Sequence, residues 1–177
     1  LLRLKFELGL FDDPFVNEDD VPKVLGHSES IAAGLASQQR AMTLLKNEGQ
    51  TLPLKGQPKI FVKNIDSSVA SHYAEIVTAP EEADFAILRL DTPWTPVETK
   101  NPFAQGFHHG DLDFKEPLKT EILELLRTVP TIVVLYLDRP AVIPEINQSA
   151  RALLAEYGAS DAAVLNIIFG KANPEGK

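Results

Sequence analysis

The sequence contains no cysteine, and this absence excludes three classes of site. A chain without thiols has no disulfide framework, no thiolate nucleophile and no cysteine-ligated zinc. No apolar run approaches the roughly 20 residues that a membrane-spanning helix needs. Basic residues are outnumbered, with 17 Lys and Arg against 25 Asp and Glu, and they form no cluster. Because phosphate groups are bound by clustered Lys and Arg, we expect neither a nucleic-acid nor a membrane partner.

Three nucleotide-binding or nucleophile motifs of α/β proteins are missing as well. The sequence has no G-x-G-x-x-G turn and no G-x-x-x-x-G-K-[ST] loop, so it lacks the usual phosphate-binding turns. It also has no G-x-S-x-G elbow, which argues against a serine hydrolase of the α/β-hydrolase type. We therefore expect no cofactor. The compartment stays open, because bacterial cytoplasm, periplasm and secretion are all compatible with a cysteine-free chain.

From residue 28 onward the sequence alternates between helical and strand patterns, after an irregular lead over residues 1–27 with a short helix at most. The expected strands are 59–63, about 75–78, 85–90, 131–137 and about 151–155, and the expected helices are 28–46, 67–73, 117–129, 143–149 and 160–169. Alternating β and α units imply parallel strands joined by right-handed crossovers. The pattern predicts a doubly wound α/β three-layer sandwich, flavodoxin-like in general form, with a mostly parallel sheet of five or six strands.

Residues 91–114 are the longest stretch without a period, and they follow the apolar strand at 85–90. Long loops in compact domains are usually functional, and parallel sheets bind ligands outside the carboxyl ends of their strands. The loop is rich in polar groups; His108, His109, Asp111 and Asp113 stand close together in it. Adjacent histidines tend to point apart, and no i, i+4 pair places two ligands on one helix face. We expect no metal site here but a loop ordered by side-chain hydrogen bonds.

Five segments, taken in order, resemble the linker and C-terminal α/β sandwich domain of family 3 glycoside hydrolases, the β-glucosidase and β-N-acetylhexosaminidase-like group. They are residues 4–14 (LKFELGLFDDP), 44–48 (LLKNE), 52–54 (LPL), 138–140 (DRP) and 169–177 (FGKANPEGK). The resemblance implies an interdomain linker over residues 1–27 and the sandwich domain over residues 28–177. It also implies an N-terminal (β/α)₈ barrel as partner and a glycoside as substrate. The chain starts without methionine and stops within a connection, so we expect both ends to be cuts.

The resemblance further implies an active site divided between two domains. A retaining glycosidase needs two carboxyl groups about 5–5.5 Å apart across the sugar, one as nucleophile and one as acid/base. In the family the nucleophile is an Asp of the barrel, and several members take the acid/base from the sandwich domain. The barrel motif has no counterpart here, so the isolated chain is expected to be inactive. The chain would form one wall of the active site.

Two carboxylates are candidates for the acid/base. Family members that carry it in this domain have a Glu after the strand equivalent to 85–90, in a Gly-Glu-x-Pro-Tyr-like stretch. Asp91 stands at that Glu position and Trp94 where an aromatic residue is expected, although the Gly is missing and Asp is shorter than Glu. Glu98 lies in the same loop and has the longer reach. The remaining alternative is that neither residue is the acid/base. In that case Asp91 caps backbone N–H groups and Glu98 is a solvated charge of the loop.

Other residues of the loop are candidates for substrate binding, namely Trp94, His108 and Asp111. Trp94, with Phe103 and Phe107, lines a sugar subsite in one interpretation and packs the loop onto the barrel in the other. Asp138 and Arg139 are expected to form a structural pair at a strand end or to contact the barrel. Two other functions stay open: a non-catalytic scaffold or carbohydrate-binding module, and an independent flavodoxin-like binding domain.

Overall fold

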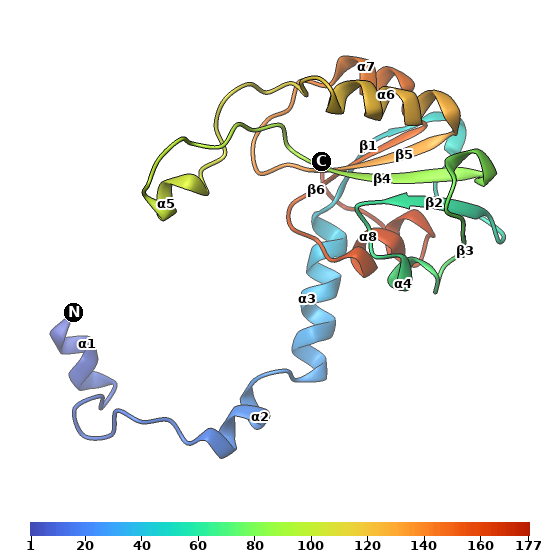
Figure 1. The fold of residues 1–177 in the computed structure, drawn as a ribbon. Coiled ribbons are helices and arrows are strands. Elements are labelled where there is room, and N and C mark those ends of the chain that lie inside the picture. Colours follow the sequence, from blue (N-terminus) through green and yellow to red (C-terminus); the bar gives the residue numbers. More distant parts are fainter. The chain divides into compact units, whose positions relative to one another are not determined.

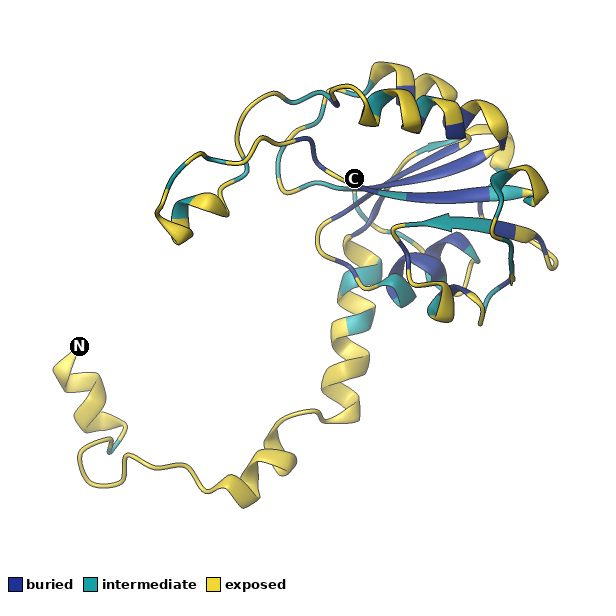
Figure 2. Cartoon of the chain, viewed as in Figure 1, coloured by how far each residue is buried: buried dark blue, intermediate teal, exposed yellow.

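The computed structural model describes residues 1–177 and divides them into two units, Leu1–Gly34 and Leu35–Lys177. The first unit contains α1 (Leu2–Glu7), the 3₁₀ turn η1 (Glu18–Asp20), α2 (Val21–Val24) and the first half of α3 (Ser28–Ala41). None of its residues is buried, as the yellow ribbon of this segment in Figure 2 shows. A lead with only short helices was expected, but the boundary between linker and domain in the whole protein stays a prediction.

The second unit is built on a six-stranded sheet with the order β1-β6-β5-β4-β2-β3 (Figure 1). Its strands are β1 (Thr43–Asn47), β2 (Lys59–Lys63), β3 (Glu75–Ile76), β4 (Phe85–Asp91), β5 (Thr131–Tyr136) and β6 (Ala152–Glu156). Every neighbouring pair is parallel except β1 with β6, which is antiparallel at one edge. The prediction of a mostly parallel sheet with five or six strands is confirmed.

Helices cover both faces of the sheet and complete three layers. One face packs against α4 (Ser67–Ala70) and α8 (Asp161–Ile168), and the other against α6 (Leu118–Thr128) and α7 (Pro144–Ser149). Side chains alternate along each strand, so Ile87 joins the first apolar core and Leu88 the second. The strands are the most buried part of the unit (Figure 2). Three short elements lie outside this frame: η2 (Glu48–Gln50), η3 (Pro80–Glu82) and α5 (Pro102–Gln105).

The predicted helix over residues 28–46 is wrong at its carboxyl end, because α3 stops at Ala41 and residues 43–47 form β1. Thr43 lies opposite Ala155 and Asn47 opposite Ala152 in the antiparallel ladder with β6. The backbone of this segment finds its partners in a strand more than 100 residues away, and such tertiary pairing overrides helical propensity. The other expected elements are confirmed to within a few residues, including α8, whose N-cap Ser160 accepts a hydrogen bond from the Ala163 amide at 3.3 Å.

The strand order reverses between β2 and β4. The chain leaves β2 through α4 toward β3 at the edge, whereas it leaves β4 through α6 toward β5 in the centre, on the opposite face. Connections that depart in opposite directions leave a crevice between the carboxyl ends of the two strands, and open α/β sheets bind ligands at such points. No helix has both the length and the apolar character required to cross a membrane.

Candidate functional site: the crevice at the carboxyl ends of β2 and β4

Asp91 and Asn64 stand on the two sides of this crevice. Asp91 is the last residue of β4 and lies opposite Tyr136 of β5, and Asn64 directly follows β2. Two hollows of about 420 and 540 Å³ open at this edge, and Asn64 and Asp91 line both of them. The Asp91 side chain is exposed and makes no hydrogen bond or ion pair. Glu98, the other candidate carboxylate, is also exposed, but it lines neither hollow.

The first hollow lies between the end of β4 and the 91–114 loop, and it is rich in hydrogen-bond acceptors. Besides Asp91, its charged residues are Asp111, Asp113 and Lys115. The Lys115 Nζ atom lies 3.0 Å from Asp111 Oδ2 and 2.9 Å from Asp113 Oδ1. The hydrogen bond with Lys115 lowers the pKa of Asp113, and the bonds with Asp113 and Asp111 raise the pKa of Lys115. With one amine shared by two carboxylates, the hollow stays negative and suits neutral hydroxyl groups better than anions.

Trp94 lies at the rim of the first hollow, and His108 supports its ring. The two ring centroids are 4.3 Å apart with an angle of 15° between the planes, a stacked arrangement. The Nδ1 atom of His108 contacts the carboxylate of Asp138, which follows β5. Trp94 is 39% exposed, so one side of the indole is available to a ligand. His108 thus stacks on the tryptophan, and its expected role in substrate binding stays a prediction.

The polar neighbours of Asp138 favour its ionised form. Partial burial raises its pKa, but the nearby Thr92 hydroxyl and the His108 imidazole outweigh burial, so the pKa is lowered from 3.8. A carboxyl group whose pKa is lowered by folding contributes stability above its unfolded pKa. That contribution is lost as the pH falls through the folded pKa.

We therefore expect Asp138→Asn to lower the melting temperature at pH 7 and the difference from the parent protein to shrink as the pH falls below 3.8. Thermal denaturation of both proteins between pH 7 and pH 3 measures this. Asp12→Asn, a substitution of an exposed residue in the first unit, is the control and should leave the difference near zero throughout. A difference that is the same at every pH would contradict the role of the ionised carboxylate.

The remaining polar residues of the loop hold its base together and do not converge on one point. The Thr95 amide donates to the His109 carbonyl oxygen at 2.7 Å, and Arg139 Nη2 donates to the Gly110 carbonyl oxygen at 2.8 Å. Asp138 and Arg139 do not pair with each other, since each contacts the loop. No three His, Asp or Glu side chains are arranged to hold a metal ion. Phe103 and Phe107 line neither hollow and are exposed.

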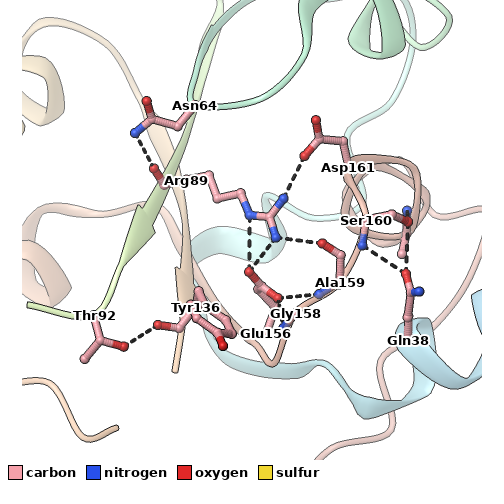
Figure 3. Close-up of polar contacts among 11 residues, drawn as sticks. Gln38, Asn64, Arg89, Thr92, Tyr136, Glu156, Gly158, Ala159, Ser160 and Asp161 are labelled. Carbon is pink, nitrogen blue, oxygen red and sulfur yellow. Dashed lines mark hydrogen bonds and ion pairs between the residues drawn. The ribbon is translucent and has the colours of Figure 1, made fainter. Parts of the chain in front are cut away.

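A partly buried ionic network around Arg89, two residues before Asp91 on β4, was not predicted (Figure 3). The guanidinium of Arg89 donates to Glu156 Oε1 from Nε at 3.2 Å and from Nη2 at 2.7 Å, and Nη1 donates to Asp161 Oδ1 at 2.7 Å. Nη2 also donates to the Ala159 carbonyl oxygen at 2.6 Å. We call Arg89, Glu156, Ala159 and Asp161 the Arg89 network. Burial lowers the pKa of Arg89, but its bonds and charge interactions with Glu156 and Asp161 prevail and raise it.

Glu156 is the most buried charged residue of the network. Its side chain is 0% exposed, and its second oxygen, Oε2, accepts from the amides of Gly158 and Ala159, both at 2.6 Å. Both oxygens of the carboxylate thereby have donors, as a buried charge requires. One signal in the sequence pointed to this network, because Arg89 is the only charged residue within the otherwise apolar stretch 85–90. Glu156 lay one residue beyond the strand expected at 151–155.

The second hollow adjoins the Arg89 network, because Arg89 itself lines it. It is lined by Asn64, Arg89, Asp91, Tyr136 and Gly158. Arg89 and Asp91 are two residues apart on a strand, so their side chains project to the same side of the sheet. Asn64 has a left-handed backbone, with φ of 62°, and its Nδ2 atom donates to the Arg89 carbonyl oxygen at 2.8 Å. Figure 3 shows this amide on the opposite side of β4 from the guanidinium contacts.

Comparison with curated proteins finds relatives along the whole chain, although no family model matches it. A probable β-glucosidase C of Aspergillus flavus is 40% identical over 181 residues, which is 100% of this chain and 28% of that protein. β-Glucosidase C of Emericella nidulans is 40% identical over 100% of this chain and 29% of its own length. A periplasmic β-glucosidase/β-xylosidase of Dickeya chrysanthemi is 31% identical over 97% of this chain and 27% of its length. The chain thus spans less than a third of these relatives.

Solved structures share the fold. The β-glucosidase of Listeria innocua in complex with isofagomine matches 97% of this chain and 30% of its own, with a TM-score of 0.75 and 19% sequence identity. The exo-1,3/1,4-β-glucanase of a Pseudoalteromonas species matches 95% of this chain and 26% of its own, with a TM-score of 0.70 and 20% identity. In both cases the matched part is a minor portion of a larger chain.

Proposed function

We propose that this chain is the C-terminal α/β domain of a family 3-like β-glucosidase, as its similarity to such enzymes along its whole length supports, and that it forms one wall of the active site of a retaining β-glycosidase. The observation that carries the proposal is the position of Asp91. It is an exposed carboxylate without a partner, at the point where the strand order reverses, and it borders two hollows. In this arrangement the rest of the whole protein supplies the nucleophile, on a (β/α)₈ barrel.

Asp91 is our candidate for the acid/base. That group must give a proton to the leaving oxygen and later take one from water, so it must be free to change its charge. No cation is bound to Asp91, in contrast to Asp113, which Lys115 holds ionised, and to Asp161, which is tied to Arg89. Glu98 has the longer side chain but lies outside both hollows. Geometry therefore favours Asp91 over Glu98.

We propose Trp94 as the residue that packs against the sugar or its leaving group. An indole presents a flat apolar face to the C–H groups of a pyranose ring, and stacking on His108 fixes the orientation of this face. Asp111 lines the same hollow and offers acceptors for hydroxyl groups, while its charge is shared with Lys115. The names of the relatives indicate β-glucosides and β-xylosides as the substrate class.

We also propose that residues 1–27 link this domain to the barrel and that residues 28–177 are the domain. Large apolar side chains of the first 27 residues are exposed, among them Phe6, Phe11 and Phe15. Apolar residues at this density without a core of their own are suited to pack on another domain. Phe103 and Phe107 at the tip of the 91–114 loop are suited to the same partner, the barrel of the whole protein.

One observation favours a second candidate function, a non-catalytic wall or carbohydrate-binding module. Asp91 is one methylene shorter than the Glu expected at this position, so its carboxyl group reaches less far into the crevice. In this alternative the barrel supplies both catalytic carboxyl groups, and Trp94 with its hollow only shapes the site.

The whole protein should hydrolyse p-nitrophenyl β-glucoside or β-xyloside with retention of the anomeric configuration, followed by absorbance and by proton NMR of the first product. The 177-residue chain alone should release no nitrophenol, because it lacks the nucleophile. Failure of the whole protein to hydrolyse either glycoside, or inversion of configuration, would overturn the proposed function.

A further inference from the structure

We propose that Asn64 is a positioning residue whose side chain fixes the end of β4 and so directs Asp91 into the crevice. The inference rests on the proposed function, because it assigns to Asn64 a role through Asp91. Asn64 itself need not touch the substrate. Three observations carry it: the backbone conformation of Asn64, the partner of its side chain, and the independent attachment of the residue to which it binds.

Asn64 adopts a backbone conformation that glycine adopts at the lowest cost. Its φ of 62° lies in the left-handed region, which a side chain disfavours and which asparagine tolerates better than most residues. Such outliers cluster at functional sites, where the surrounding structure maintains them. Asn64 lines the same two hollows as the candidate acid/base Asp91. An asparagine here, where glycine would be less strained, indicates that its side chain makes a contact that glycine could not make.

The contact is a hydrogen bond that extends the pairing between β2 and β4. The register of these strands runs from Ile60 opposite Phe85 to Lys63 opposite Leu88, where β2 ends. One residue further, the Asn64 amide replaces the missing strand and donates from Nδ2 to the Arg89 carbonyl oxygen at 2.8 Å. The β2 side of β4 is therefore held to within two residues of Asp91.

Arg89 is attached on its other side as well. Its guanidinium is bound to Glu156, Asp161 and the Ala159 carbonyl of the Arg89 network, so its main chain and its side chain are held by different elements (Figure 3). Beyond Asp91, Thr92 is buried and its hydroxyl donates to the Tyr136 carbonyl oxygen at 2.5 Å. Asp91 thus projects from a strand end that is fixed before and after it. Catalytic groups need such support, because displacement by about 1 Å can cost about 100-fold in rate.

The substitution Asn64→Gly in the whole protein tests this role. It removes the amide and also relieves the left-handed backbone, so its two effects on stability oppose each other and the melting temperature should change by only about 3 °C or less. We expect kcat/KM for phenyl β-glucoside to fall about tenfold. The fall should be smaller for 2,4-dinitrophenyl β-glucoside, whose leaving group needs less protonation by the acid.

Gln50→Gly is the matched control. Gln50 is the other residue besides Asn64 with a positive φ that is not glycine, at 56°, and it follows β1 at the opposite edge of the sheet. Its side chain makes no hydrogen bond in the structure, so glycine relieves the backbone there without removing a contact. Activity should not change in this variant.

A double-mutant cycle with Asp91→Asn distinguishes positioning from a structural role. If Asn64 acts through Asp91, Asn64→Gly should have no further effect in the Asp91→Asn background, measured with phenyl β-glucoside. An equal fall in both backgrounds, or no fall in either, would overturn the inference while leaving the role of Asp91 intact. If Asp91→Asn alone keeps full activity, the acid/base assignment fails first and this inference falls with it.

Discussion

Replacing Asp91 by asparagine in the whole protein should lower kcat/KM for phenyl β-glucoside by about 10²–10⁴-fold. Asparagine keeps the shape of the side chain but has no proton to give to the leaving oxygen and cannot take one from water. The melting temperature should stay close to that of the parent protein, because the Asp91 side chain is exposed and makes no contact that the substitution removes. Loss of activity without loss of stability would mark Asp91 as a chemical rather than a structural residue.

Two further measurements make the assignment specific. With 2,4-dinitrophenyl β-glucoside, whose leaving group departs without protonation, the Asp91→Asn variant should form the glycosyl-enzyme, and added azide should then restore turnover and yield the β-glycosyl azide. Azide attacks the anomeric carbon without needing a base, and the bond to the nucleophile breaks as the bond to nitrogen forms. Glu98→Gln is the control and should keep nearly full activity. Rescue of Glu98→Gln instead would move the acid/base to Glu98, and full activity in both variants would favour the non-catalytic wall.

Removal of the guanidinium of Arg89 should have the largest effect on stability. In Arg89→Met the carboxylate of Glu156 stays 0% exposed but loses its only cation, keeping just the two backbone amides. Breaking a buried ion pair at one partner typically costs about 3–5 kcal/mol. Urea denaturation of this chain should show a lower midpoint with an unchanged slope.

A second substitution and an exposed ion pair provide the controls. Glu156→Gln added to Arg89→Met removes the stranded charge but keeps an oxygen for the amides of Gly158 and Ala159, so part of the lost stability should return. Lys59→Met removes one partner of the exposed Lys59–Glu75 pair, whose charged atoms are 3.5 Å apart, and should cost less than about 1 kcal/mol. Equal losses in Arg89→Met and Lys59→Met would show that burial of Glu156 adds nothing to the cost.

The fold was predictable because its signals are local. Apolar runs such as 85–90 and 131–137 are typical of strands buried on both faces, and the amphipathic stretch 117–129 is typical of a covering helix; the structure confirms each. The carboxyl-end rule for parallel sheets placed Asp91, from the sequence alone, at the edge of the sheet where the two hollows open. The end of α3 was missed because the partner of residues 43–47 is β6, and a partner that distant leaves no trace in local periodicity.

The candidate site was only partly predictable. Trp94 and His108 were both expected to contact substrate, but their stacking on each other was not predicted. It depends on the backbone path of the irregular 91–114 loop, and a loop without hydrophobic periodicity gives no sequence signal for that path. The choice between Asp91 and Glu98 depended on the same path. In the Arg89 network, Arg89 is 67 positions from Glu156 and 72 positions from Asp161 in the sequence. The only sign of the network in the sequence was therefore the charge of Arg89 within an apolar strand.

The base of the 91–114 loop is closed by pairing, so the length and sequence of its tip can change without a change in the backbone next to Asp91. The pairing of Thr95 with His109, and of Asp113 with Val142, fastens the stem of the loop next to Asp91, while the intervening residues with α5 extend beyond it. Because the entropy of closing a loop rises only slowly with its length, the tip can gain or lose residues at little cost. Under the proposed function, selectivity for the leaving group can therefore diverge at the tip while the proton-transfer geometry at the stem is inherited unchanged.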